Sequence, residues 1–185
     1  IERLKALPHV TLNMLSDTIR LAKLFKNEMG IPFALSPIPI DFAHYDALPP
    51  AQKNVVPDAP RSLLFVGEAR AEKGFPFICA ALKSLLISSK QSFMPIMQTL
   101  GFTPAQLGWS KQALSQTRFI NQTLLPPEYY QLLSLAGAVL VPYDVREYTY
   151  RSSHILVEAL GFGRPVITMP NGWMEDEIKR LRSES

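Results

Sequence analysis

The sequence predicts an α/β fold with a parallel sheet covered by helices on both faces, preceded by one β-α-β unit. From residue 62 onward, apolar runs of strand length alternate with segments of helical period. Hydrophobic residues make up 47% of the chain and charged residues 19%, which suffices for a buried core. At about 150 residues per domain, 185 residues allow one domain and part of a second.

The first unit is expected from an amphipathic helix between two short strands at residues 10–14 and 31–36. Ser16 is expected to cap the helix, and Gly30 is expected to end it. One face of this helix carries the apolar residues Leu15, Ile19, Ala22, Phe25 and Met29.

Prolines are dense over residues 37–60, which show no sustained period. Proline removes backbone donors and disfavours regular structure, so residues 37–61 are predicted to be an interdomain linker. We therefore expect residues 1–36 to be the remnant of an N-terminal domain and residues 62–185 to form a C-terminal domain.

The C-terminal domain is predicted to contain five strands, each an apolar run bounded by turn residues. They cover residues 62–67, 93–98, 117–121, 138–142 and 165–169. Helices are predicted in the intervals, at residues 73–86, 104–116, 127–136, 153–161 and 174–183.

Charge and composition exclude several classes of protein. The net charge of +3 is spread over both halves, so no nucleic-acid-binding stripe is expected. No apolar run approaches the length of about 20 residues needed to span a bilayer. A single Cys79 fits a cytoplasmic protein, and the histidines His9, His44 and His154 lack metal-ligand spacing, so no metal site is expected.

The loop from Gly67 to Gly74 leaves the first strand of the C-terminal domain. Arg70 and Lys73 place cations where a strand turns into a helix, which suits an anion. The alternative is a solvated turn in which both cations are paired to Glu68 and Glu72.

The loop after the strand at residues 138–142 leads into a short apolar helix that Ser152 or Ser153 can cap. The positive end of that helix also suits a phosphate. Glu158 lies among apolar neighbours in the helix and is expected to have a polar partner. The alternative is that Glu158 faces outward into solvent.

A third loop, residues 119–125, follows the strand at residues 117–121. It carries apolar and amide side chains that could line a nucleobase pocket. The alternative is a simple connector.

The order of these motifs resembles the donor-binding half of a GT-B fold glycosyltransferase, within glycosyltransferase family 4. LLFVGEARAEKGF is similar to the family's first strand and loop of the C-terminal domain. VEALGFGRPVIT is similar to its Glu-Ala-Leu helix and Gly-x-Pro-Val strand, and the likeness covers about residues 62–178. The resemblance implies a Rossmann-like donor domain preceded by the last unit of the acceptor domain.

The resemblance assigns roles to individual positions. Lys73 matches the lysine that contacts the donor diphosphate, and Glu158 matches the glutamate that binds the donor ribose. Ser153 and His154 fall at the helix start that meets the diphosphate, and Ile120 falls near the base-contacting loop.

Two positions depart from the family pattern. Tyr150 stands where the family has the first glutamate of its motif, with Glu147 three positions away. Glu68 stands where arginine is usual, and Arg70 is expected to substitute for it. The predicted catalytic residues are Lys73 and Arg70, and the predicted donor-binding residues are Glu158, Gly67, Ser152, Ser153, His154, Tyr150 and Ile120.

The resulting hypothesis is an enzyme that transfers a sugar from a nucleotide-diphosphate sugar to an unknown acceptor. The resemblance implies retention of anomeric configuration. Cations at the leaving diphosphate make a metal unnecessary, and no cofactor beyond the donor is expected. The alternative is a non-catalytic nucleotide- or partner-binding α/β module. The resemblance also implies that most of the acceptor domain, through which a peripheral membrane contact could be made, and the end of the donor domain lie outside this sequence.

Overall fold

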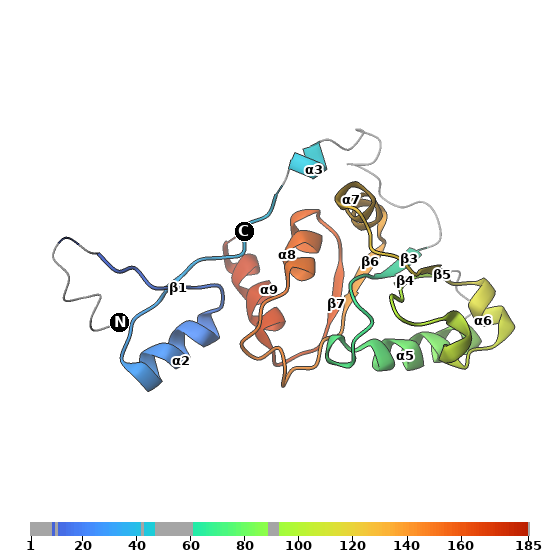
Figure 1. Ribbon diagram of the computed structural model, residues 1–185, viewed down its shortest axis with the longest axis horizontal. Helices are drawn as coiled ribbons and strands as arrows, with labels where there is room; N and C mark the ends of the chain where they lie inside the picture. Colours follow the sequence, from blue (N-terminus) through green and yellow to red (C-terminus); the bar gives the residue numbers. More distant parts are fainter. Residues whose placement is uncertain (1–8, 10, 42, 47–60, 89–92, 185) are drawn as a thin grey trace.

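The computed structural model describes residues 9, 11–41, 43–46, 61–88 and 93–184 (Figure 1). At its centre is a five-stranded sheet of order β5-β4-β3-β6-β7, in which every pair of neighbours is parallel. The strands are β3 (Arg61–Phe65), β4 (Phe93–Gln98), β5 (Arg118–Ile120), β6 (Ala138–Val141) and β7 (Val166–Thr168). All five predicted strands of the C-terminal domain are confirmed, with ends that differ by no more than two residues.

Helices cover both faces of this sheet, as expected for a parallel sheet (Figure 1). One face packs on α5 (Phe75–Ser88) and α6 (Lys111–Ser115), with Phe65, Leu82 and Trp109 in its core. The other face packs on α7 (Pro126–Leu135) and α8 (His154–Gly161), and α9 (Trp173–Glu184) joins this second core through Trp173 and Met174.

The strand order places a switch point between β3 and β6. From β3 the chain continues outward through β4 to β5, and it then returns to add β6 and β7 on the other side of β3. At such a point the loops after the two central strands diverge and leave a crevice, where open α/β sheets bind ligands. The loops that follow β3 and β6 therefore border this crevice.

The helix predicted at residues 104–116 is interrupted. The structure has a 3₁₀ turn, η2 (Pro104–Leu107), followed by α6. Between them Gly108 adopts a left-handed backbone with φ 61°, and Ser110 caps α6 by accepting a hydrogen bond from the N–H of Ala113 at 3.2 Å. Trp109 is thereby turned into the core beside Phe119.

The N-terminal unit consists of α2 (Ile19–Met29) between the parallel strands β1 (Leu15–Ser16) and β2 (Ala34–Leu35). The strand predicted at residues 10–14 is wrong in position, because residues 11–14 form no strand and β1 begins at Leu15. The predicted cap is also wrong, because Ser16 lies in β1 and Thr18 accepts the capping hydrogen bond from Leu21 N–H at 3.1 Å. Gly30 ends the helix as predicted, with φ 64°.

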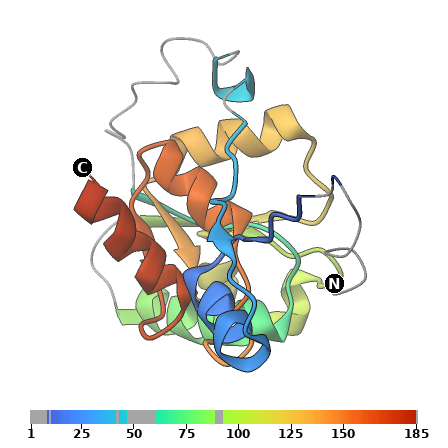
Figure 2. The ribbon, with the colours of Figure 1, turned by 90° about the vertical axis from the view of Figure 1, so that its left-hand side faces the viewer.

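Two polar contacts join this unit to the C-terminal elements. The guanidinium of Arg20 on α2 forms a two-point ion pair with Asp176 on α9, and the hydroxyl of Ser152 donates to the carboxylate of Asp17. Figure 2, in which the N-terminal unit faces the viewer, shows α2 beside α9.

Part of the predicted linker is also described. Ile38 and Ile40 pack against the core of α7 and α8, and α3 (Ala43–Asp46) follows them. Residues 47–60 of the predicted linker, and residues 1–8 of the predicted remnant, lie outside the described residues, and the division into domains stays a prediction. Among the described helices, none is both long and apolar enough to cross a membrane.

Candidate functional site

Gly67 lies at the centre of the candidate site, directly after β3. Its φ of 101° favours glycine, and two side chains lie close to the position that a Cβ atom would occupy. A Cβ placed there would lie 2.9 Å from Lys73 Nζ and 3.2 Å from Ile155 Cδ1. The loop after β3, the turn η1 (Ala71–Lys73) and the first turn of α8 therefore meet at Gly67.

The loops after β3 and β6 are also locked to each other. Gly74 has φ 74°, and a Cβ there would lie 2.0 Å from the carbonyl oxygen of Pro142. The N–H of Asp144 donates to the carbonyl of Glu72 at 2.8 Å. This contact fixes η1, and with it Lys73, against the end of β6.

Lys73 is the cation most enclosed by the site. Burial lowers the pKa of its ammonium group, and the nearby charge of Arg70 lowers it further. The ammonium lies 5.9 Å from the ring centroid of Tyr143, which is buried. Within the described residues Lys73 makes no ion pair, so its charge is available to an anionic ligand.

Arg70 is engaged differently from Lys73. Its Nε lies 3.2 Å from a carboxylate oxygen of Glu68 and 3.1 Å from one of Glu72, and its side chain is 43% exposed. For Arg70 the alternative of a solvated, paired turn is therefore observed. Arg70 and Lys73 lie at the same loop, but among the described residues only Arg70 is in direct ion pairs with Glu68 and Glu72.

The first turn of α8 has the predicted cap. The Ser153 hydroxyl accepts a hydrogen bond from Leu156 N–H at 3.3 Å and is buried, while His154 begins the helix and is exposed. The hydroxyl of Ser152, a predicted donor-binding residue, donates a hydrogen bond to the carboxylate of Asp17 in the N-terminal unit. The backbone N–H groups that open α8 supply the positive helix end.

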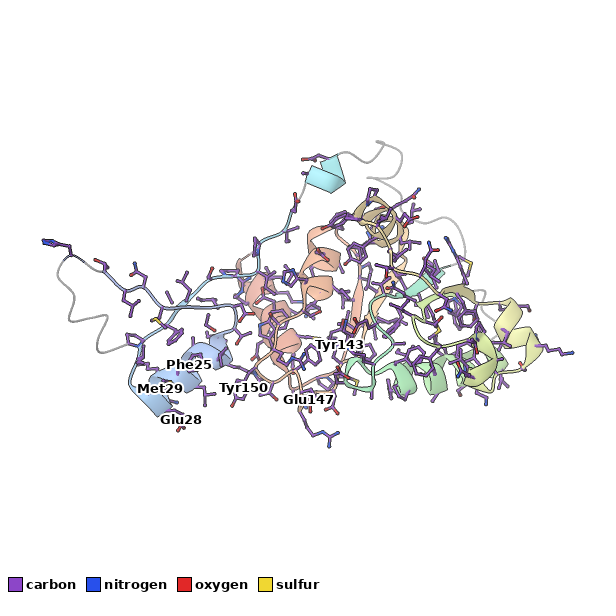
Figure 3. The ribbon with its side chains drawn as sticks, in the orientation of Figure 1. Phe25, Glu28, Met29, Tyr143, Glu147 and Tyr150 are labelled. Carbon is purple, nitrogen blue, oxygen red and sulfur yellow. The ribbon has the colours of Figure 1, made fainter. Side chains whose placement is uncertain are left out.

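Tyr150 lies in the loop between β6 and α8. It is 43% exposed, and Figure 3 shows it on the side of the loop toward α2, whereas Tyr143 lies on the side toward the sheet. Glu147, in the same loop, is exposed and lies 3.9 Å from Arg151. The position of the first motif glutamate of the family is therefore occupied by a tyrosine, and the nearby Glu147 is directed to Arg151.

Glu158 has the polar partners that its apolar neighbours predicted. Its Oε2 accepts a hydrogen bond from the hydroxyl of Tyr129 at 2.5 Å, and its Oε1 accepts one from Tyr130 at 3.1 Å. Burial raises the pKa of both phenols, that of Tyr130 to about 12, and the charge of Glu158 adds to both shifts. The alternative of an outward-facing Glu158 is excluded by these two contacts.

Ile120 belongs to the core. It ends β5, is 8% exposed and packs in the cluster under α7 and α8. A cavity of about 510 Å³ lies beside it between β5 and α7, and the polar groups that line it include Asn121 and Gln122. Ile120 has an apolar side chain, so any side-chain hydrogen bond in this cavity would come from its polar lining residues, which also include Arg118, Glu128 and Gln131.

Gln98 is a site residue that the sequence analysis missed. It ends β4 and is buried, and its amide accepts from Gly67 N–H at 2.7 Å and donates to the Gln122 carbonyl at 2.9 Å. It thus joins the loops after β3 and β5. A glutamine at the end of an otherwise apolar strand is the signal that could have identified it.

Arg151 is a second residue that was missed. Its guanidinium lies 4.9 Å from the ring centroid of Tyr148, and its charge contributes to the lowered pKa of Lys73. The loop after β6 thus adds a cation near Lys73. Within the described residues, no group of three His, Cys, Asp or Glu side chains could hold a metal ion.

Comparison with solved structures identifies the fold. The chain is similar to WaaG, a glycosyltransferase involved in lipopolysaccharide biosynthesis, with a TM-score of 0.64 and 20% identity over 95% of this chain and 49% of that one. A glycosyltransferase from Rickettsia africae has a TM-score of 0.61 and 9% identity, over 92% of this chain and 52% of that one. AviGT4, a glycosyltransferase involved in avilamycin A biosynthesis, has a TM-score of 0.60 and 17% identity, over 89% of this chain and 47% of that one.

These similarities show that the chain has the fold of the GT-B glycosyltransferases, as the resemblance implied. The chain spans about half the length of each of these structures. No family model and no curated protein sequence matches it.

Proposed function

We propose that this chain is the donor-binding part of a glycosyltransferase that transfers a sugar from a nucleotide-diphosphate sugar to an acceptor, with retention of configuration and without a metal. The observation that carries the proposal is the meeting of Lys73 and the first turn of α8 at Gly67. In this proposal the donor diphosphate binds between Lys73 and the first turn of α8, and the donor ribose binds at Glu158.

The chemistry of the leaving group explains why such a site would accelerate transfer. As the glycosidic bond breaks, negative charge grows on the diphosphate. The Lys73 ammonium and the first N–H groups of α8, at His154 and Ile155, are positioned before the reaction and stabilise that charge. Because Lys73 is partly buried, its field is less screened than that of a surface lysine.

Arg70 and Ser153 have supporting roles in the proposal. Arg70 adds a second positive field that Glu68 and Glu72 partly compensate. Ser153 caps α8 and so keeps its first N–H groups directed at the diphosphate. No cofactor other than the donor is needed, and a cytoplasmic location fits the single Cys79.

A binding experiment tests the site. UDP, GDP and ADP are titrated into the chain while its thermal unfolding is followed; a ligand at 100 times its Kd adds about 2.7 kcal/mol of stability. Lys73→Ala is expected to weaken the best ligand about 10-fold to 100-fold, because it removes a charged hydrogen bond. The matched control is Lys179→Ala, which removes an exposed lysine paired to Glu175 on α9.

Absence of stabilisation by every nucleotide would overturn the proposal, as would an equal effect of the Lys73 and Lys179 variants. Catalysis is tested separately with the corresponding nucleotide sugars. Slow donor hydrolysis that is unaffected by EDTA and first releases the sugar with its original anomeric configuration is expected. Binding without any turnover favours the alternative, a non-catalytic nucleotide-binding module.

A further inference from the structure

We propose that Tyr129 and Tyr130 are positioning residues that orient Glu158 to accept hydrogen bonds from a vicinal diol. The inference rests on the proposed function, since the diol meant is that of the donor ribose. It goes further by assigning the recognition of that diol to two residues on α7 that lie 28 and 29 positions from Glu158 in the sequence.

The contacts fix both oxygens of the carboxylate from one side. Tyr129 and Tyr130 are consecutive on α7, and their rings meet edge to face with centroids 5.1 Å apart. Each hydroxyl donates to a different oxygen of Glu158. A carboxylate held at both oxygens cannot rotate freely, so its remaining lone pairs keep one direction.

The two phenols are themselves held in place. The ring of Tyr130 stacks on Phe162, just after α8, with centroids 5.4 Å apart and planes at 11°, and Tyr130 is 8% exposed. Tyr129 lies close enough to Tyr143 for Tyr143 to add to the raised pKa of the Tyr129 phenol. The stacking on Phe162 and the packing of Tyr130 in the core therefore keep the pair in place beside Glu158.

The protonation of the two phenols determines which hydrogen-bond partners the Glu158 carboxylate can accept. Both phenols are protonated at neutral pH, and their raised pKa values extend this to alkaline pH, so they act as neutral donors to the carboxylate. A carboxylate has about four lone-pair sites, and two remain after the tyrosine contacts. Two adjacent acceptor sites on one anion match the two O–H donors of a ribose diol.

The test compares ribose and dideoxyribose forms of one nucleotide. Calorimetry gives the Kd of UDP, GDP and ADP, and of their 2′,3′-dideoxy counterparts, for the wild-type chain. The wild type is expected to prefer the diol form of its best nucleotide at least 10-fold. In Tyr129→Phe and in Tyr130→Phe this preference is expected to fall several-fold, while the Kd of the dideoxy form stays unchanged.

A double-variant cycle separates positioning from packing. In a Glu158→Gln background the Tyr129→Phe change is expected to have no further effect on the diol preference. Near-ultraviolet circular dichroism checks that each variant folds, and Tyr130→Phe serves as the test if Tyr129→Phe does not fold.

The outcomes distinguish the inference from the proposed function. If the wild type prefers the diol and both tyrosine variants keep that preference with only a lower Tm, the tyrosines are structural and the inference is overturned, while the proposed function stands. If no nucleotide binds the wild type, the proposed function fails and the inference fails with it.

Discussion

The side-chain oxygen of Gln98 accepts a hydrogen bond from the backbone N–H of Gly67 at 2.7 Å. The same amide donates to the Gln122 carbonyl at 2.9 Å, so one buried side chain holds the loops that follow β3 and β5. The position of Gly67, where Lys73 and α8 meet, depends on this contact.

Gln98→Leu is expected to lower the free energy of unfolding by about 1–3 kcal/mol, because it removes two part-buried hydrogen bonds that each contribute roughly 0.5–1.5 kcal/mol. Urea denaturation measures the change. The control is Gln112→Leu on the exposed face of α6, which is expected to stay within about 0.5 kcal/mol of the wild type. Equal effects of the two substitutions would show that the Gln98 contacts contribute nothing.

Gly74→Ala is expected to destabilise the chain more than Gly163→Ala. Both glycines have a left-handed backbone, which costs an alanine about 1–2 kcal/mol. Only at Gly74 does the added Cβ meet backbone, 2.0 Å from the Pro142 oxygen, whereas nothing lies within 4 Å at Gly163. Thermal and urea unfolding of the two variants make the comparison, and equal losses would contradict the close contact.

Nucleotide affinity is expected to fall as pH rises, and the fall is expected to begin at a lower pH than it would if Lys73 had the pKa of an ordinary lysine. Burial lowers the pKa of Lys73 below 10.5, so its positive charge is lost on the acid side of that value. Calorimetric titration with UDP, GDP or ADP from pH 7 upward follows the loss. Lys73→Arg, whose charge does not titrate in this range, is expected to remove it. An identical pH dependence in that variant would assign the effect to another group.

The tyrosines that contact Glu158 are expected to make stability fall at alkaline pH. The pKa of Tyr130 is raised from 10 to about 12, so between these values the folded chain binds more protons than the unfolded chain. The free energy of unfolding therefore decreases as pH rises through this window. Tyr130→Phe is expected to show a shallower decrease in urea unfolding measured from pH 8 to pH 11. A slope equal to that of the wild type would contradict the shift.

The ion pair between Arg20 and Asp176 is expected to hold α2 against α9. Arg20→Ala should cost no more than about 1 kcal/mol in global stability, because both side chains are 31% exposed. Hydrogen exchange of α2 should nevertheless become faster. Lys23→Ala, on the exposed side of the same helix, is the control. The exchanged pair Arg20→Asp with Asp176→Arg should restore protection, and failure to do so would contradict a direct ion pair.

The central sheet could be predicted because its strands are buried on both faces. Such strands appear as continuous apolar runs, as in β3 and β6, and their alternation with helices predicts parallel order. The first strand could not be placed, because β1 has two residues of which Leu15 is exposed, too short a pattern to locate. The break at Gly108 was missed because an apolar period continues on both sides of it.

The candidate site could be predicted as far as its loops and its charged residues. Lys73 stands out as a cation where a strand turns into a helix, and Glu158 stands out as an ion among apolar neighbours. Their partners could not be predicted: Tyr129 is 29 positions from Glu158, and only the packing of α7 on α8 brings them together. The hydrogen bond between Ser152 and Asp17 could not be predicted either, because the two residues lie 135 positions apart in the sequence.

The contact between Gly74 and Pro142 and the hydrogen bond from Asp144 to Glu72 couple the loops after β3 and β6, so that neither loop can move independently of the other. A change of specificity by loop exchange must therefore transfer both loops together. A loop after β6 taken from another protein would have to follow the same backbone path at positions 142 and 144, with no proline at 144, or Lys73 would lose its position. In a selection for nucleotide binding, substitutions in the two loops are expected to occur together. Lys73 is expected to be retained only in loop combinations that keep both contacts.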